Sequence, residues 1–149
     1  MRTVWFALFD TTIDEVEGHL SRAGFDGPHN ESYRWYYPAG ERAILYLDVE
    51  DYGWVEKYQL HDEYAELIQS VGGSEPTVHV SADVSGRYSG DNETRFLAKT
   101  LLNRFKGYAF DDYLSYSHAW SLDEIESSMK VNGLYFFDYK GHYEKNKLK

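Results

Sequence analysis

The stretch DVSGRYSGDNETRFLAKTLLNRFKGYAFDDYLSYSHAWSLDEIE, residues 83–126, contains the two most clearly delimited helices that the sequence predicts. In the first, an apolar side chain recurs every fourth residue, at Leu97, Leu101 and Phe105. This spacing places one apolar stripe along a helix. We expect Asp91 or Asn92 to cap the start of this helix with a side-chain oxygen. We expect Gly107 to end it, because glycine readily adopts the left-handed conformation that terminates helices.

The second helix of this stretch begins with a capping box. Ser121 and Glu124 have the spacing in which the serine oxygen accepts from the third helical N–H and the glutamate reaches back to the serine N–H. Between the two helices, residues 108–120 contain alternating large side chains, which is typical of an extended segment. The stretch therefore predicts a helix, an extended segment and a second helix.

Three strings in this stretch carry a family resemblance: SGRYSGD (85–91), LLNRFKGYAFDDY (101–113) and SHAWSLDEI (117–125). Together they resemble bacterial polymorphic-toxin immunity proteins, without singling out a subfamily. The resemblance implies a small non-enzymatic protein that blocks a toxin domain made by the same or a neighbouring cell.

Composition limits the function classes further. The 149 residues have a net charge of −10, include 17% aromatic residues and contain no cysteine. A negative field of this size disfavours nucleic acid and anionic membranes as partners, and favours a basic protein. The absence of cysteine excludes disulfides and thiolate metal sites and suits a cytoplasmic location. The apolar run at residues 4–9 is too short for a signal peptide or a membrane span.

The remaining patterns predict an α+β fold in a single domain, residues 1–139, followed by a basic, flexible tail, residues 140–149. The predicted elements are strands at 4–9, 33–37, 42–49, 77–84 and 134–139, and helices at 12–23 and 62–71. Up to residue 84 the order is β-α-β-β-α-β, as in ferredoxin-like folds. We therefore expect an antiparallel sheet with helices packed on one face, ferredoxin-like in its first half, and a C-terminal α-β-α-β extension.

The most promising partner-binding segment is Asp48–Glu66, in which seven acidic residues and one lysine give a net charge of −6. Aromatic side chains interleaved with carboxylates suit the interface with a basic protein, because aromatics anchor a partner and charges steer it. The candidate residues in this segment are Asp48, Glu50, Asp51, Tyr52, Trp54, Glu56 and Tyr58. Asp111, Asp112 and Tyr116 form a second candidate face.

Two alternatives stay open. His118 with Asp111 or Asp112 would suit a small hydrolase or a metal-assisted enzyme. The second alternative is an acidic adaptor protein. Because the sequence contains no complete catalytic or metal-ligand signature, we expect no enzymatic activity, no metal and no cofactor. We therefore interpret the sequence as that of a cytoplasmic immunity protein, which occludes a basic toxin domain such as a nuclease.

Overall fold

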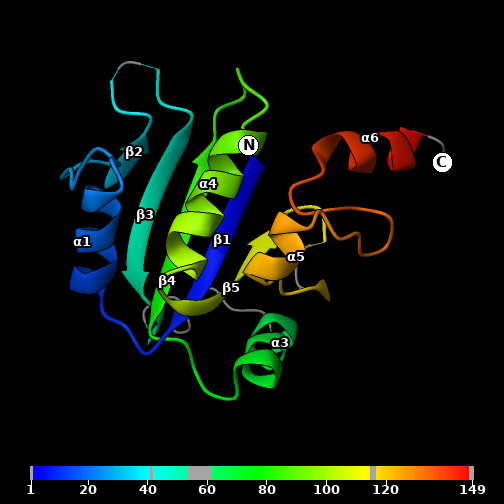
Figure 1. The fold of residues 1–149 in the computed structure, drawn as a ribbon, viewed down its shortest axis with the longest axis horizontal. Helices are drawn as coiled ribbons and strands as arrows, with labels where there is room; N and C mark the ends of the chain where they lie inside the picture. The colour runs from blue at the N-terminus through cyan, green and yellow to red at the C-terminus, as the bar shows by residue number, and fades with distance from the viewer. Residues whose placement is uncertain (1, 41, 54–61, 115–116, 148–149) are drawn as a thin grey trace.

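The computed structural model describes residues 2–40, 42–53, 62–114 and 117–147, and within them five antiparallel strands form one sheet in the order β2-β3-β4-β1-β5 (Figure 1). The strands are β1 (Arg2–Phe9), β2 (Trp35–Tyr37), β3 (Leu45–Asp51), β4 (Val78–Val84) and β5 (Lys106–Asp111). The helices are α1 (Ile13–Arg22), α3 (Asp62–Gly72), α4 (Asp91–Leu102), α5 (Leu122–Glu126) and α6 (Tyr139–Lys147). The α+β class and the antiparallel sheet are as the sequence predicts.

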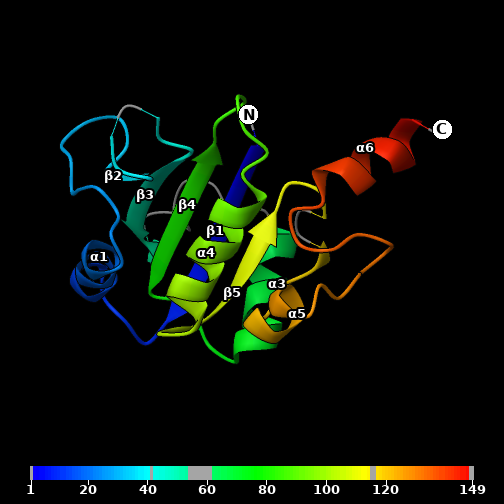
Figure 2. The same cartoon turned by 45° about the horizontal axis from the view of Figure 1, so that its top comes forward.

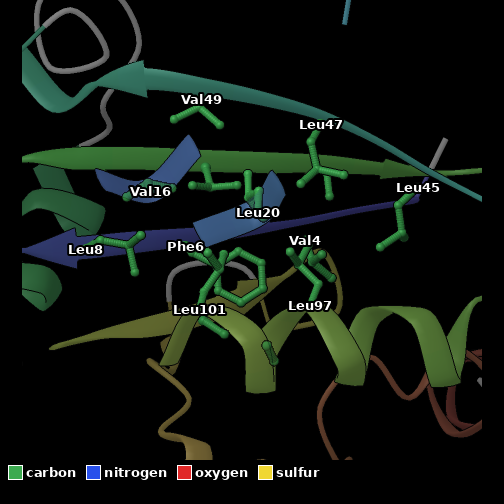
Figure 3. Close-up of a cluster of buried hydrophobic side chains, with 14 of the residues drawn as sticks. Val4, Phe6, Leu8, Val16, Leu20, Leu45, Leu47, Val49, Leu97 and Leu101 are labelled. Carbon is green, nitrogen blue, oxygen red and sulfur yellow. The ribbon is translucent and has the colours of Figure 1, made fainter. Parts of the chain in front are cut away.

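The main core lies between one face of the sheet and helices α1 and α4. Alternate residues of β1, β3 and β4 point to this face, because successive side chains of a strand point to opposite sides. Figure 3 shows them in contact with Val16 and Leu20 of α1 and with Leu97 and Leu101 of α4. The apolar run at residues 4–9 lies in β1, which is paired with β4 on one side and β5 on the other, as is usual for a strand that is apolar on both faces.

Helix α3 packs on the opposite face, so the expectation that all helices lie on one face is wrong. Its Tyr64 and Ile68 form a second core with Phe9 of β1 and Phe110 of β5. This second core covers the β1–β5 half of the face. The stripe of apolar residues in α3 predicts a buried side correctly, but not the sheet face against which that side is buried.

The strand order also differs from a ferredoxin-like sheet, although the order of elements along the chain up to β4 is the predicted one. In a split βαβ unit, β3 and β4 would be parallel, with another strand inserted between them. Here β3 and β4 are hydrogen-bonded antiparallel neighbours, with Leu47 opposite Ala82, and β1 lies on the far side of β4.

The structure contradicts the predictions for both ends of helix α4. The N-cap is Gly90, with φ of 74°, and no side chain caps the helix, so neither Asp91 nor Asn92 has the predicted role. A Cβ at Gly90 would lie 2.4 Å from the Val84 side chain, which is a second reason for glycine at this turn. Gly107 does not end the helix; it lies within β5, where its missing side chain lets the strand approach the Ala7 carbonyl.

The C-terminal part differs from the predicted strand and tail. Turns replace the expected strand at 134–139, and helix α6 starts at Tyr139, one residue before the predicted domain boundary. The capping box of α5 is present as predicted, with the Ser121 side chain accepting from Glu124 N and the Glu124 side chain accepting from Ser121 N. None of the helices that the structure describes is long and apolar enough to span a membrane.

Candidate partner-binding face

The half of the sheet that α3 leaves uncovered is lined by polar and aromatic side chains of β2, β3 and β4. The cross-strand register aligns Tyr36 with Tyr46, and Tyr46 with Asp83, in one row. Asp48 and Glu50 follow on β3, opposite Ser81 and His79 of β4. We call this surface the acidic sheet face and define it by six residues: Tyr33, Tyr36, Tyr46, Asp48, Glu50 and Asp83.

Alternation along the strands produces this face. In β3, Leu45, Leu47 and Val49 are buried against the main core, so Tyr46, Asp48 and Glu50 must point to the other side. All six residues of the acidic sheet face are half-buried, which leaves each of them partly accessible to a partner.

The three tyrosines form a cluster around Tyr46. The Tyr46 ring centroid lies 5.5 Å from that of Tyr33 and 5.5 Å from that of Tyr36. The Tyr33 hydroxyl donates a hydrogen bond to Asp83, and this bond is the main reason that the pKa of Tyr33 is raised to about 12. Tyr33 therefore stays protonated at neutral pH and holds the Asp83 carboxylate in place, together with Thr3, whose hydroxyl donates to Asp83 over 2.8 Å.

The carboxylates of this face repel one another. Burial raises the pKa of Asp48, the neighbouring Arg34 lowers it, and the Asp83 carboxylate raises it. Burial also raises the pKa of Glu50, with a further contribution from Asp48. Ionisation of these groups is therefore less favourable here than in water, and a cation brought to the face would offset that cost.

Arg34, whose charge acts on Asp48, is already engaged in an ion pair with another residue. Arg34 donates from Nε to Glu17 over 2.7 Å and from a terminal nitrogen over 2.8 Å, a two-pronged ion pair. In the part of the chain that the structure describes, no salt bridge involves Asp48, Glu50 or Asp83. The face thus presents carboxylates whose charge the fold itself neutralises only in part.

The structure places the residues of the predicted binding segment, Asp48–Glu66, in different environments. Asp48 and Glu50 lie on the acidic sheet face, and Asp51 is exposed at the end of β3, where its carboxylate accepts from Gly53 N over 2.8 Å. Tyr52 is 4% exposed and belongs to the second core, so its ring is not on the surface. The predicted residues Trp54, Glu56 and Tyr58 lie outside the described residues, as does Tyr116.

Asp111 and Asp112 are adjacent in the sequence but differ in solvent exposure and in the number of hydrogen bonds that they accept. Asp111 is 1% exposed and accepts hydrogen bonds from the backbone N–H groups of Tyr113, Leu114 and Phe137. The exposed Asp112 accepts from the Thr3 N–H over 2.7 Å. Burial raises the pKa of both carboxyl groups. Asp111 therefore holds the fold together from within and is not accessible to a partner.

The His118–aspartate pairing considered from the sequence is not formed by Asp111. His118 Nε2 lies 3.2 Å from both carboxylate oxygens of Glu124, and its ring packs edge-on against Trp120 at 4.6 Å between centroids. Within the described residues, no three histidine or acidic side chains are grouped so that they could hold a metal ion.

Four residues of the acidic sheet face were not among the predicted site residues: Tyr33, Tyr36, Tyr46 and Asp83. Asp83 shares the polar face of β4 with His79 and Ser81, because buried and partly exposed residues alternate along this strand. What the sequence does not show is that β3 pairs with β4 and so brings Asp48 next to Asp83.

Comparison of the chain with protein-family models, with curated proteins and with solved structures gave no match in any of the three. The function is therefore argued from the geometry of the acidic sheet face.

Proposed function

We propose that this protein is a cytoplasmic immunity protein, which binds a basic toxin domain, such as a nuclease, and neutralises it by occlusion without turnover. The observation that supports this most directly is the acidic sheet face, where Asp48, Glu50 and Asp83 lie beside three tyrosines without a salt bridge in the described chain. The resemblance of residues 83–126 to polymorphic-toxin immunity proteins favours the same class.

The two kinds of side chain have separate roles in this proposal. The carboxylates attract the basic surface of the toxin and accelerate association, since charge complementarity acts mainly on the encounter rate. The tyrosines supply the contact area that slows dissociation, since tyrosine is enriched among the residues that dominate binding energy. A lysine or arginine of the toxin, placed between Asp48 and Asp83, would relieve their mutual repulsion.

Occlusion requires no chemistry on the part of the immunity protein. A nuclease domain binds its substrate with a basic surface, because phosphate contacts dominate nucleic-acid affinity. A protein that covers this surface with carboxylates competes with the substrate for the same charges. If a toxin domain is encoded directly upstream of the gene, it is the first partner to test, because an immunity protein has to be made wherever its toxin is made.

The test measures association and dissociation rates against that upstream toxin domain by surface capture. The variant Asp48→Lys with Glu50→Lys should associate at least about tenfold more slowly at low salt, and its rate should depend less on salt. A matched control is Glu75→Lys with Glu126→Lys, which changes the net charge equally at exposed positions that do not belong to the face. The control should associate at close to the wild-type rate.

The aromatic part is tested separately with Tyr36→Ala and Tyr46→Ala. If these rings anchor the partner, each variant should lose about 2 kcal/mol of binding, which is roughly a 30-fold faster dissociation. Circular dichroism has to show that each variant is folded. Co-expression with the toxin gives the biological readout, and the variants that bind poorly should fail to protect the cell. Wild-type rates and full protection in both sets of variants would refute the proposal for this face.

A further inference from the structure

A polar cavity of about 380 Å³ lies at the end of the sheet where β3 begins and β4 ends. The turn before β3, the start of β3 and the turn after β4 line it, with Arg42, Ala43, Tyr46, Ser85, Arg87 and Tyr88. Figures 1 and 2 show both turns at the same end of the molecule, beside the N-terminus. We call it the arginine cavity. Its volume falls in the range of about 300–1,000 Å³ that is typical of small-molecule sites.

The sheet ties together the backbone segments that carry Arg42 and Arg87. The Ser85 N–H donates to the Ile44 carbonyl over 2.8 Å, which extends the pairing of β3 with β4 by one step. The Arg2 guanidinium donates to the Ser85 carbonyl over 2.8 Å, and the Arg87 N–H donates to the Ser85 hydroxyl oxygen over 3.3 Å. These bonds hold the backbone on both sides of the arginine cavity in place before a ligand arrives.

The fold leaves both guanidinium groups of the lining without a counter-ion. Within the part of the chain that the structure describes, no salt bridge and no side-chain hydrogen bond involves Arg42 or Arg87. Arg34, by contrast, is paired with Glu17. An arginine side chain stays positively charged in proteins. The arginine cavity therefore presents two permanent positive charges whose hydrogen-bond donors are available to a ligand.

The carboxylates near the arginine cavity are fewer than its cations. Among the described residues, the lining contains no carboxylate. Asp83 lies opposite Tyr46 in the β3–β4 register and opposes the approach of an anion. Its oxygens already accept hydrogen bonds from the hydroxyls of Tyr33 and Thr3, which stabilise its charge within the fold. One carboxylate beside the cavity against two guanidinium groups in the lining leaves a local positive excess.

We propose that the arginine cavity binds a phosphate group, either as inorganic phosphate or as a phosphate monoester. Such a group carries nearly two negative charges at neutral pH, which matches the two arginines. A guanidinium group can donate two parallel hydrogen bonds to phosphate oxygens, and these bonds are stronger than those between neutral groups. Tyr46 and Tyr88, also in the lining, offer hydroxyl groups and ring surface to the organic part of a monoester.

This site goes beyond the proposed immunity function, and its test needs no toxin. The probes are glycerol 2-phosphate and inorganic phosphate, with acetate as the anion of single charge. Each is titrated into the nitrogen-15-labelled full chain at pH 7.5, with sodium chloride keeping the ionic strength constant. The backbone amide signals of Ala43 and Arg87 should shift to saturation, with a dissociation constant on the order of 1 mM or lower. Acetate should bind at least about tenfold more weakly, because it leaves one arginine unpaired.

The two phosphates distinguish the source of the ligand. Tighter binding of glycerol 2-phosphate would assign the cavity to a monoester, whose organic part then contacts the tyrosines. Equal or tighter binding of inorganic phosphate would assign it to the free ion.

Two variants locate the site. Arg42→Gln and Arg87→Gln each remove one charge from the lining and should weaken both phosphates at least about fivefold. Both should fold normally, because these side chains are exposed. The matched control is Arg104→Gln, which removes the same charge at an exposed position just before β5, near the end of β1 that is far from the cavity. The control should bind as the wild type does, and melting temperatures check that every variant is folded.

The proposal is overturned if neither phosphate produces saturable shifts, or if acetate binds equally well. It is also overturned if Arg104→Gln weakens binding as much as Arg87→Gln, since the net charge of the protein would then explain the effect. Because the titrations contain no toxin domain, these outcomes are independent of whether the acidic sheet face binds one.

Discussion

Replacement of Asp111 by asparagine tests how the carboxyl end of β5 is tied to the C-terminal segment. One carboxylate oxygen, Oδ1, accepts from Tyr113 N over 3.1 Å and from Leu114 N over 3.0 Å. The other, Oδ2, accepts from Phe137 N over 2.7 Å. Three backbone donors from two distant parts of the chain therefore depend on one side chain.

The expected loss in the free energy of unfolding follows from the hydrogen bonds that an asparagine side chain can make at this position. Its single oxygen can keep the bonds at Tyr113 and Leu114, although these lose the contribution of the negative charge, about 0.5–1 kcal/mol each. Its amide nitrogen then faces Phe137 N, donor against donor, in a buried place, and the unsatisfied N–H costs about 1–3 kcal/mol. We expect Asp111→Asn to lower the free energy of unfolding by about 2–5 kcal/mol.

Asp112→Asn is the matched control, because it makes the same chemical change one residue further on. Asp112 is exposed, and its hydrogen bond to Thr3 N can be kept by the asparagine oxygen. We expect a loss below about 1 kcal/mol. Urea unfolding followed by the fluorescence of the buried Trp120 measures both, and hydrogen exchange at the Phe137 amide shows whether the C-terminal segment opens first.

Equal losses in Asp111→Asn and Asp112→Asn would refute the reasoning, because the argument depends on burial and on the number of donors. A loss below about 1 kcal/mol in Asp111→Asn would show that water or a local shift satisfies the Phe137 N–H.

Three further predictions concern other parts of the fold. Burial lowers the pKa of His79 to about 4, so this neutral histidine contributes stability above pH 6.5 that is lost as the pH falls towards 4. The loss between pH 7 and pH 4.5 should be about 2 kcal/mol and be absent in His79→Gln, as urea unfolding at both pH values would show. Gly107→Ala should lower stability by about 1–3 kcal/mol in the same assay, because the new Cβ would meet the Ala7 carbonyl oxygen at 2.4 Å; no change would mean that the strands separate easily. Ser121→Ala should cost about 0.5–2 kcal/mol in thermal unfolding through loss of the α5 cap, and an unchanged melt would contradict a stabilising role for that cap.

Features that depend on residues close together in the sequence could be predicted from the sequence. The Ser121–Glu124 capping box joins residues three positions apart, so no tertiary information is needed to predict it. The polar face of β4 follows in the same way from the alternation of side chains along a strand. The position of β1 between two other strands follows from the apolar run at residues 4–9, which is typical of a strand covered on both faces.

The acidic sheet face could be predicted only in part. Asp48 and Glu50 were recognised from the local density of acidic residues, which is a property of the chain. Tyr33 and Asp83 are 50 residues apart, and the pairing of β3 with β2 on one side and with β4 on the other brings them into hydrogen-bond contact. No periodicity along the chain encodes that pairing, because the same alternating strands are compatible with several strand orders.

Local patterns in the chain are enough to predict the α+β class, the position of β1 inside the sheet and the α5 cap, because each depends on interactions within a few residues. Tertiary structure alone decided the strand order, the face on which α3 packs, and the different environments of Asp111 and Asp112. The physical reason is that an apolar stripe or an alternating strand specifies that one side must be buried. Which surface buries it is settled by long-range packing, and with it the place where charges such as Asp48 and Asp83 come together.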